Sequence, residues 1–511
     1  MIFHLDGQGP LYEQLTRALR DRIRSGALAV GFRLPGSRRI ARSLGISRNV
    51  VLGAFDQLIL EGYLEARGGS GTYVADALST QPEKRPRGAA PQATGWRVDE
   101  SLLSRRGKAL VDEVRKGPMP VRADQTIEFD FQYGLVEPDA TSVHLLRKFL
   151  SRSLDAGQFD YGQPAGLESL RSTIAQHLNA YRGLRVSAAQ IVVVSGSQQA
   201  LDLTARLLLS PGDQVLIEEP QYQGARQSFR AAGARLQAIP VDANGIRIGA
   251  DTPPAKLIYS TPSHQFPTGA VVPLARRYRL LDWAAKHRAL VLEDDYDSEF
   301  RYDSRPVEAV AGLCPDGPVI YSGTFAKSLF PGLRLGFLAV PPKLVKAFTH
   351  AKWLSDRACS TPIQSAVAQF MAEGHYRRHL RRMNLRYRQT RQALVEALSS
   401  SFGEHIRIQG THAGIHLVVW FDQLPASMEP LLVREAAKCG CAVYPISSYY
   451  IYPRALEAPG LILGYSALKP DDMATAVARL RAAWSNLTTS SHRQTARSSR
   501  RPNPTRLRSR G

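Results

Sequence analysis

The 511-residue sequence has only four cysteines and no long apolar run. The cysteines show neither CxxC pairing nor neighbouring histidines, so we expect no metal site and no disulfide framework. No stretch reaches the length of a transmembrane helix, and the N-terminus lacks the basic and apolar segments of a signal peptide. We therefore expect a cytoplasmic protein that does not associate with membranes. The cysteines are Cys314, Cys359, Cys439 and Cys441.

Acidic residues are outnumbered, with 45 aspartates and glutamates against 66 lysines and arginines, for a net charge of +21. Lysine and arginine attract phosphate backbones whatever their sequence, so the surplus suggests a nucleic-acid partner. Residues 1–75 carry +4, residues 76–124 carry +3 and the last 26 residues carry +7. The rest is spread over a large segment and indicates nothing by itself.

Composition divides the chain into four parts, which predicts a multidomain protein. Residues 1–75 show a helical pattern that ends in a glycine-rich turn. Residues 76–124 have the proline, glycine and charge content of a linker, although 101–114 could be helical. Residues 125–485 alternate short β-branched strands with helical stretches, which is typical of an α/β domain with a mainly parallel sheet. Residues 486–511 are almost devoid of apolar side chains and predict a disordered basic tail.

The N-terminal part predicts two short helices joined by a tight turn at Gly45. Ser37 can cap the first of them and Ser47 the second. Arg48 and Asn49 then stand at the start of the second helix, where a recognition helix presents side chains to base edges or phosphates. The following stretch YLEARGGSGTYVA alternates and turns on small residues, which predicts a β-hairpin wing.

Together these features resemble the GntR-type winged-helix family over residues 9–75, in the segment LPGSRRIARSLGISRNVVLGAFDQLILEGYLEARGGSGTYV. The resemblance implies that operator DNA is a partner. Asn49 occupies a position where threonine is more usual, which leaves the base preference there open. The implied DNA contacts are Arg33, Ser37, Arg38, Ser47, Arg48, Asn49, Arg67 and the wing glycines, including Gly69.

The α/β part contains the groups that pyridoxal phosphate requires: an amine that forms an imine, an acid at the pyridine nitrogen, a phosphate-binding region and a surface against the ring. Lys327 follows a buried-strand pattern in YSGTFAKSLFPGLRLGF. Ser322 and Thr324 precede it and Arg334 follows it. These hydroxyls and the planar guanidinium can hold a phosphate while the lysine amine reaches the aldehyde.

Three further segments complete this set. A turn after the strand IVVV opens a helix, so free backbone N–H groups and the helix dipole would face an anion. Asp294 ends the strand ALVLED, where ligands of α/β sheets bind, and could pair with the pyridinium nitrogen. Tyr296 could reach the ring hydroxyl, and Tyr222 could stack on the ring. The segment EDDYD could instead be a charged loop or a metal site, but the lack of a histidine nearby in sequence disfavours a metal site. The turn residues are Ser195, Gly196, Ser197 and Gln198.

These motifs resemble fold-type I aminotransferases. The order of winged helix, linker and aminotransferase-like domain resembles the MocR subfamily of GntR-type regulators over residues 9 to about 485, with TPSHQFPTG, EDDYDSEFRY and TFAKSLFPGLRLG as its most specific motifs. The resemblance implies Lys327 as the imine lysine, Asp294 as the pyridinium partner and Tyr296 at the ring hydroxyl. It also implies a head-to-tail homodimer in which Tyr161 reaches the partner's phosphate. The implied phosphate ligands are Ser197, Gln198, Thr324 and Arg334.

Two positions differ from the enzymes. Phe266 stands before PTG, where aminotransferases usually have asparagine, so His264 or Gln265 must replace that polar contact or it is lost. Residues 461–463 are Leu-Ile-Leu where an enzyme places the arginine that grips the substrate carboxylate, which predicts poor turnover unless another arginine, such as Arg226, serves.

The leading hypothesis is a regulator whose operator binding responds to an amine, an amino acid or pyridoxal phosphate itself. A working aminotransferase with an accessory DNA-binding domain, or a DNA-binding protein with a vestigial cofactor site, are the alternatives.

Overall fold

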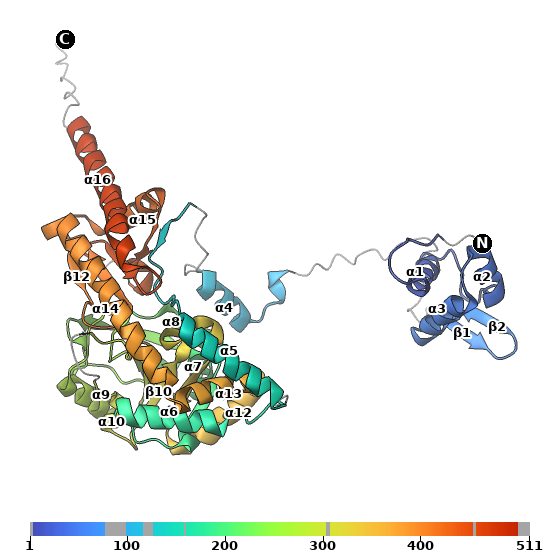
Figure 1. Cartoon of the computed structure of the whole chain (residues 1–511), viewed down its shortest axis with the longest axis horizontal. Helices are drawn as coiled ribbons and strands as arrows, with labels where there is room; N and C mark the ends of the chain where they lie inside the picture. The colour runs from blue at the N-terminus through green and yellow to red at the C-terminus, as the bar shows by residue number, and fades with distance from the viewer. Residues whose placement is uncertain are drawn as a thin grey trace, which may run out of the picture. The chain divides into compact units, whose positions relative to one another are not determined.

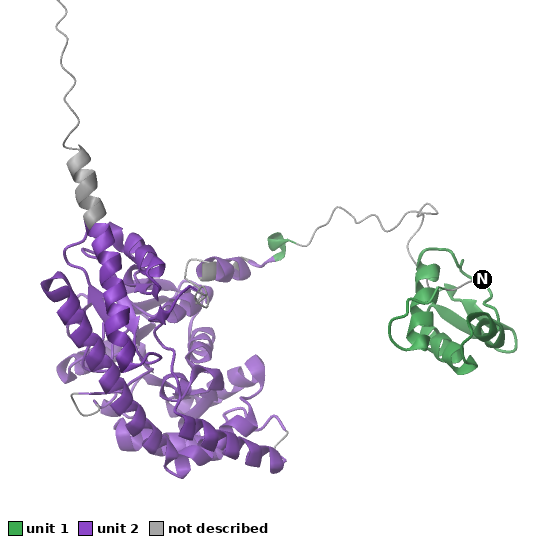
Figure 2. Ribbon diagram, turned by 45° about the horizontal axis from the view of Figure 1, so that its top comes forward, with its two compact units in different colours: residues 1–102 green, residues 103–511 purple. Residues whose placement is uncertain are grey.

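The chain forms two compact units, residues 1–102 and residues 103–511, which are coloured separately in Figure 2. No helix within the described ranges is long and apolar enough to cross a membrane. The computed structural model describes residues 4–76, 99–115, 126–157, 160–302, 307–452 and 456–498.

The first unit is a winged helix-turn-helix (Figure 1). Three helices are followed by an antiparallel hairpin whose strands pair Leu64 with Val74 and Arg67 with Gly71. Gly45 ends the second helix with a φ of 66°, a left-handed conformation that glycine adopts without strain. The predicted N-terminal fold is therefore confirmed. Its elements are α1 (Leu11–Arg24), α2 (Ser37–Leu44), α3 (Arg48–Leu60), β1 (Leu64–Arg67) and β2 (Gly71–Val74).

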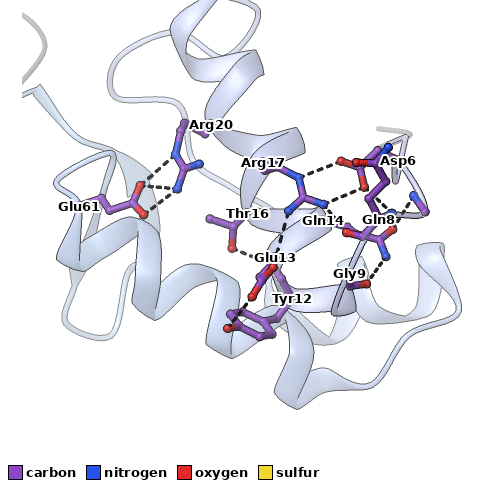
Figure 3. Close-up of polar contacts among 11 residues, drawn as sticks. Asp6, Gln8, Gly9, Tyr12, Glu13, Gln14, Thr16, Arg17, Arg20 and Glu61 are labelled. Atoms are coloured by element: carbon purple, nitrogen blue, oxygen red, sulfur yellow. Dashed lines mark hydrogen bonds and ion pairs between the residues drawn. The ribbon is translucent and has the colours of Figure 1, made fainter. Parts of the chain in front are cut away.

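Polar contacts fix α1 to the segments around it (Figure 3). Arg17 pairs with Asp6 of the N-terminal arm at 2.8 Å, and Arg20 pairs with Glu61, just after α3, at 2.6 Å. Such surface ion pairs contribute only about 0–1 kcal/mol each. The apolar side chains buried among the helices and the hairpin therefore supply most of the stability, and the ion pairs add little to it.

One predicted helix cap is correct and the other is wrong. The Ser47 hydroxyl accepts a hydrogen bond from the Val50 N–H at 3.4 Å and so caps α3. Ser37, in contrast, is the first residue of α2, and the residue before it, Gly36, makes no side-chain cap. Ser37 instead accepts a hydrogen bond from Arg48 at 3.3 Å, which ties the starts of α2 and α3 together.

The predicted linker contains a helix that packs on the second unit. Helix α4 (Arg105–Arg115), in the stretch considered as helical, lies against α8 (Gln223–Ala231). Glu113 is buried and pairs with Arg230 at 3.1 Å, while Arg106 donates to the Ala231 carbonyl at 3.1 Å. The α4 segment is therefore part of the larger unit and not of a linker. Residues 77–98 and 116–125 lie outside the described residues.

The second unit is built on an eight-stranded mixed sheet in the order β4-β11-β10-β9-β8-β5-β6-β7. Strands β10, β9, β8, β5 and β6 are parallel to one another, whereas β11 and β7 are antiparallel to their neighbours, so the predicted mainly parallel sheet is confirmed. The strands are β4 (Ile191–Val194), β5 (Gln214–Glu219), β6 (Arg235–Asp242), β7 (Gly245–Ile246), β8 (Leu257–Ser260), β9 (Leu290–Asp295), β10 (Val319–Thr324) and β11 (Gly336–Ala339).

Helices cover both faces of this sheet, which is why its central strands β8, β9 and β10 are almost entirely buried. Along β4, Val193 joins an apolar cluster with α5, α6 and α13, whereas Val192 and Val194 join another with α7, α8 and α12. The helices are α5 (Ala140–Asp155), α6 (Glu168–Tyr181), α7 (Ser197–Leu208), α9 (Leu274–His287), α10 (Val310–Leu313), α11 (Phe325–Ser328), α12 (Val345–Asp356) and α13 (Thr361–Ala372).

A smaller α/β subdomain follows the long helix α14 (His375–Phe402). Its four-stranded sheet has the order β12-β13-β16-β15, and β14 pairs with β3. Helix α14 packs against α13, which covers the large sheet, and against α16 of the smaller subdomain, so it connects the two parts of the unit (Figure 1). The elements are β3 (Phe129–Asp130), β12 (Arg407–Gln409), β13 (His416–Trp420), α15 (Glu429–Lys438), β14 (Cys441–Ala442), β15 (Tyr444–Pro445), β16 (Gly460–Gly464) and α16 (Met473–Ser498).

The predicted boundary at residue 485 falls inside α16. The helix continues to Ser498, so the first part of the segment predicted as a disordered tail is helical. Residues 499–511 lie outside the described residues.

Candidate functional site

A cavity of about 180 Å³ lies at the carboxyl ends of β4, β9 and β10. Ligands of α/β sheets bind at such strand ends, because the loops that follow the strands surround an open crevice there. Most of the predicted cofactor residues line this cavity. They are Gly196, Ser197, Gln198, Tyr222, Asp294, Tyr296, Thr324, Lys327 and Arg334.

Lys327 reaches the cavity from α11, which directly follows β10. Its amine donates a hydrogen bond to the Gly134 carbonyl at 2.9 Å. Burial lowers the pKa of Lys327 to about 8, although the nearby Asp297 and Asp294 act in the opposite direction. A lowered pKa gives a larger neutral fraction near pH 7, and the neutral amine is the nucleophilic form.

Asp294 reaches the cavity from the end of β9. The Tyr259 hydroxyl donates to its Oδ2 at 2.8 Å, whereas its Oδ1 is buried and has no hydrogen-bond partner among the described residues. Burial raises the pKa of Asp294 to about 7. A buried carboxylate oxygen without a partner is costly, and a cationic N–H group in the cavity would satisfy it.

The start of α7 and Arg334 form an anion-binding region in the wall of the cavity. Ser197 is the first residue of α7, so its N–H is among those left without a partner within the helix. Gly196 has a φ of 91°, and a Cβ there would lie 3.6 Å from the Arg334 guanidinium. Arg334 donates to the Ser195 carbonyl at 2.8 Å. Thr324 lines the same cavity and caps α11, accepting from the Ala326 N–H at 3.1 Å.

Three predicted cofactor residues do not line the cavity. The Ser195 hydroxyl is hydrogen-bonded to Asp356 at 3.2 Å, outside the cavity, so only its carbonyl serves the site. Ser322 lies deeper in β10, where it is fully buried. Tyr161 is 73% exposed.

The structure adds an aromatic wall that the sequence did not indicate. Tyr133, which follows β3, packs its ring 5.3 Å from that of Phe266, and the Phe266 ring lies 5.8 Å from that of Tyr222. His416 of β13 lines the same cavity, and burial lowers its pKa to about 3, so the imidazole is neutral. No motif surrounds Tyr133 or His416, and only the fold brings them to Lys327.

The winged helix presents its predicted DNA-contacting residues to solvent. Arg48 and Asn49 begin α3, and both are exposed, as is Arg38 on α2. Arg67 on the wing pairs with Glu65 and lies over the Tyr73 ring at 4.6 Å. All the remaining predicted contacts except Ser37, which is half-buried, are also exposed: Arg33, Ser47 and Gly69.

Two family models match the chain: bacterial regulatory proteins of the gntR family over residues 11–74, and class I and II aminotransferases over residues 138–480. The chain is 36% identical over 487 residues to the probable rhizopine catabolism regulatory protein MocR of Rhizobium meliloti, covering 95% of this chain and 96% of that protein. The chain belongs to the MocR-type regulators of the GntR family. It is therefore a DNA-binding transcriptional regulator with an aminotransferase-like domain.

Another regulator and a solved structure agree with this assignment. The pyridoxine biosynthesis regulator PdxR of Corynebacterium glutamicum is 28% identical over 467 residues, covering 91% of this chain and 94% of that protein. The α-aminoadipate aminotransferase LysN of Thermus thermophilus, solved with N-(5'-phosphopyridoxyl)-L-leucine, is 26% identical with a TM-score of 0.67, covering 76% of this chain and 98% of that one. The second unit thus has the pyridoxal-phosphate-binding fold of fold-type I aminotransferases.

In this MocR-type chain, the missing asparagine before PTG is not replaced by Gln265. The Gln265 amide donates to the Pro220 carbonyl at 2.8 Å, away from the cavity. His264 also stays outside the cavity, but its Nδ1 lies 3.0 Å from the Tyr296 hydroxyl and 2.9 Å from Asp297. His264 therefore contacts the cavity residue Tyr296 but does not itself line the cavity.

The fold also brings two histidines to the acidic cluster EDDYD, although neither of them is near this cluster in the sequence. His264, Asp297 and His416 offer nitrogen and oxygen atoms that lie within 4.8 Å of one another. His264 Nδ1 already contacts Asp297 and Tyr296, so these atoms form a hydrogen-bonded group that supports the cavity. The absence of a bound metal stays a prediction.

Proposed function

We propose that this regulator binds pyridoxal phosphate at Lys327 and that the state of this site changes the affinity of the winged helix for operator DNA. The observation that supports cofactor binding most directly is the buried Oδ1 of Asp294, which lacks a partner among the described residues and belongs to a side chain that lines the cavity. A protonated pyridine nitrogen is the group that such an atom fits.

Each residue then has a role set by its chemistry. Bound pyridoxal phosphate supplies an electrophilic aldehyde that reacts reversibly with amines. Lys327 supplies the neutral amine, and Asp294 holds the proton on the ring nitrogen. Arg334, with Thr324 and the α7 N–H groups, binds the phosphate. Tyr296 serves the ring hydroxyl; the remaining predicted ligands are Tyr222 at the ring face, and Gly196, Ser197 and Gln198 at the phosphate.

The effector is proposed to be an amine, an amino acid or pyridoxal phosphate itself. Arg334 is the one arginine among the described residues that line the cavity, and the phosphate occupies it in this proposal. Residues 461–463 are buried and apolar in β16, and Arg226 of α8 does not line the cavity. This arrangement favours an effector that does not depend on a second arginine for its carboxylate.

An absorbance titration of the purified full-length protein tests this proposal. Candidate amines and amino acids are added to protein loaded with pyridoxal phosphate, and operator affinity is measured with and without each one. We expect an effective compound to change the visible spectrum and the operator affinity of the wild type but not of Lys327→Ala. Lys343→Ala, at an exposed lysine outside the cavity, is the matched control. Equal operator affinity with every compound would refute the regulatory role.

A working aminotransferase is the second candidate, supported by the shared fold and by Lys327 and Asp294 in one cavity. Multiple-turnover formation of keto acid from a common amino donor would establish it. A vestigial site is the third possibility. It predicts no visible absorbance after incubation with pyridoxal phosphate and full regulatory function in Lys327→Ala.

We also propose that the protein acts as a head-to-tail homodimer in which Tyr161 completes the partner's phosphate site. The support is the exposure of Tyr161, although it belongs to the segment YGQPAGLESLR that leads into α6. A mixture of Tyr161→Phe and Lys327→Ala chains tests it, because a mixed dimer has one site with both residues intact. Cofactor affinity restored in the mixture supports the exchange, and no restoration contradicts it.

A further inference from the structure

A second cavity, of about 540 Å³, lies in the larger unit apart from the Lys327 site. It is formed by the end of α6, residues 298–301 after β9, and one face of α14, and it shares no lining residue with the cofactor cavity. Among the described residues that line it, five are arginines: Arg182, Arg301, Arg377, Arg381 and Arg388.

The side chains that line this arginine cavity carry mainly positive charge. Among its described lining residues the only carboxyl group is that of Glu299, and burial raises the pKa of Glu299 to about 8, so this side chain is largely neutral at pH 7. Burial also lowers the pKa of His177 to about 4, which leaves the imidazole uncharged. Arg182 is compensated by Asp295 at 2.7 Å, but Arg381 is exposed and has no hydrogen bond or ion pair within the described part of the chain. Positive charge therefore dominates the lining.

Two residues that line the arginine cavity each have a buried polar atom without a hydrogen-bond partner among the described residues. Glu299 Oε2 and Asn384 Oδ1 make no hydrogen bond to any described residue. A protonated Glu299 can donate to an anionic oxygen, and the Asn384 amide oxygen can accept from a hydroxyl or amine. Buried groups of this kind are normally paired, so a bound molecule would satisfy them.

We infer that this arginine cavity binds a small anionic metabolite that carries phosphate or carboxylate groups together with a hydroxyl or amine. Guanidinium groups match both anions because their planar fork donates two parallel hydrogen bonds. This anion site is separate from the proposed cofactor site and does not depend on it.

A DNA backbone is the other anion that arginines bind, but the cavity fits it less well. Arg182 is only 3% exposed, and the unpaired atoms of Glu299 and Asn384 are buried. A phosphate in a duplex stays at the surface of the DNA and would not reach these groups, whereas a small molecule would. The bound anion would bridge α6 to α14, which itself packs against both α13 and α16 (Figure 1).

Calorimetric titration of the full-length protein with glucose 6-phosphate, citrate and uncharged glucose tests the inference. We expect glucose 6-phosphate or citrate, but not glucose, to bind the wild type, and the stronger of the two identifies the preferred anion. Arg381→Gln should weaken that binding about tenfold or more, since it removes a charged hydrogen-bond donor. Arg378→Gln, next to Arg377 on the exposed side of α14 and outside the cavity lining, should bind like the wild type.

Arg334→Gln separates the two sites, because it affects the cofactor cavity alone. Loss of anion binding in Arg334→Gln with normal binding in Arg381→Gln would place the anion in the cofactor cavity and overturn the inference. Failure of the wild type to bind either anion would also overturn it. Weakened operator binding in Arg381→Gln, without any change in metabolite binding, would show instead that these arginines contact DNA. Circular dichroism of each variant excludes misfolding as the cause.

Discussion

Replacing Asp294 with asparagine should weaken pyridoxal phosphate binding strongly while preserving the fold. The amide keeps the shape of the carboxylate, and its oxygen can still accept the hydrogen bond from Tyr259, now 2.8 Å from Oδ2. What is lost is the negative charge at the unpaired Oδ1. A buried charge-assisted hydrogen bond contributes about 1.5–3 kcal/mol, so the dissociation constant should rise about 10- to 150-fold.

The measurement is a titration of cofactor-free protein with pyridoxal phosphate at about pH 7.5, slightly above the pKa to which burial raises Asp294, followed by visible absorbance and calorimetry. Tyr259→Phe is the matched control, because it leaves the carboxylate and removes one neutral hydrogen bond, which contributes about 0.5–1.5 kcal/mol. Wild-type affinity in Asp294→Asn, or an equal loss in both variants, would contradict the pairing of Asp294 with the ring nitrogen.

The pH dependence of binding gives a second readout of the same pairing. Burial raises the pKa of Asp294 to about 7 in the free cavity, and a cationic ring beside it would favour the ionised form and lower that pKa. Binding must therefore displace a proton from Asp294 at low pH. Affinity should fall as the pH drops below about 7, and the fall should be shallower in Asp294→Asn, where only the Lys327 amine still has to lose a proton.

Three other substitutions test other parts of the molecule. Arg48→Ala should weaken operator binding and, if Arg48 contacts a phosphate, reduce the slope of log affinity against log salt by about one in fluorescence anisotropy titrations; unchanged binding would remove it from the interface. Burial acts to raise the pKa of Asp139, but contacts with Ser142 and His379 help to hold it well below its usual range. This stabilisation is present at neutral pH and is lost as the pH falls through that depressed pKa. The free energy of unfolding, measured with urea, should therefore fall less steeply with decreasing pH in Asp139→Asn than in the wild type. An equally steep fall in both would count against this role of Asp139. Glu113→Gln removes a half-buried ion pair and should loosen α4 by about 1 kcal/mol, seen as faster hydrogen exchange in α4 alone; identical exchange would mean that α4 is held by its other contacts.

Local signals explain why the winged helix could be predicted from the sequence. A cap such as Ser47, a left-handed glycine such as Gly45 and an alternating hairpin act within a few residues of one another. The error at Ser37 has the same origin, because Gly36 and Ser37 both fit the start of a helix and only the backbone decides between them. Neither choice changes which face of α2 is buried.

The cofactor site was predictable where a motif coincides with the end of a strand. Lys327 follows β10 and Asp294 lies at the end of β9, and the sheet brings these two strand ends together. Ser322 does not line the cavity because it precedes Thr324 by two residues on β10, about 6.6 Å deeper in the strand. Tyr133 and His416 lie far from Lys327 in sequence and carry no local pattern, so only the packing of the small subdomain against the large sheet reveals them.

The linker prediction failed at α4 because composition does not report tertiary contacts. The α4 segment is charged and its helix is short, and short helices gain most of their stability from packing. Glu113 is buried only because Arg230 of α8 lies opposite to it. A charged residue whose partner is more than a hundred positions away looks in sequence like any residue of a solvated linker.

Two consecutive residues of β9 link the cofactor cavity to the arginine cavity. Asp294 and Asp295 are consecutive on β9, and consecutive side chains of a strand point to opposite faces. Asp295 pairs with Arg182 of the arginine cavity, and after burial its charge is among the causes that raise the pKa of Asp294. An anion on Arg182 would compete with Asp295 for the guanidinium, leave the charge of Asp295 less compensated and so favour the protonated form of Asp294. That form cannot hold a cationic ring. By linkage, cofactor and anion would weaken each other's binding by the same factor, and in Arg381→Gln this effect should need about tenfold more anion.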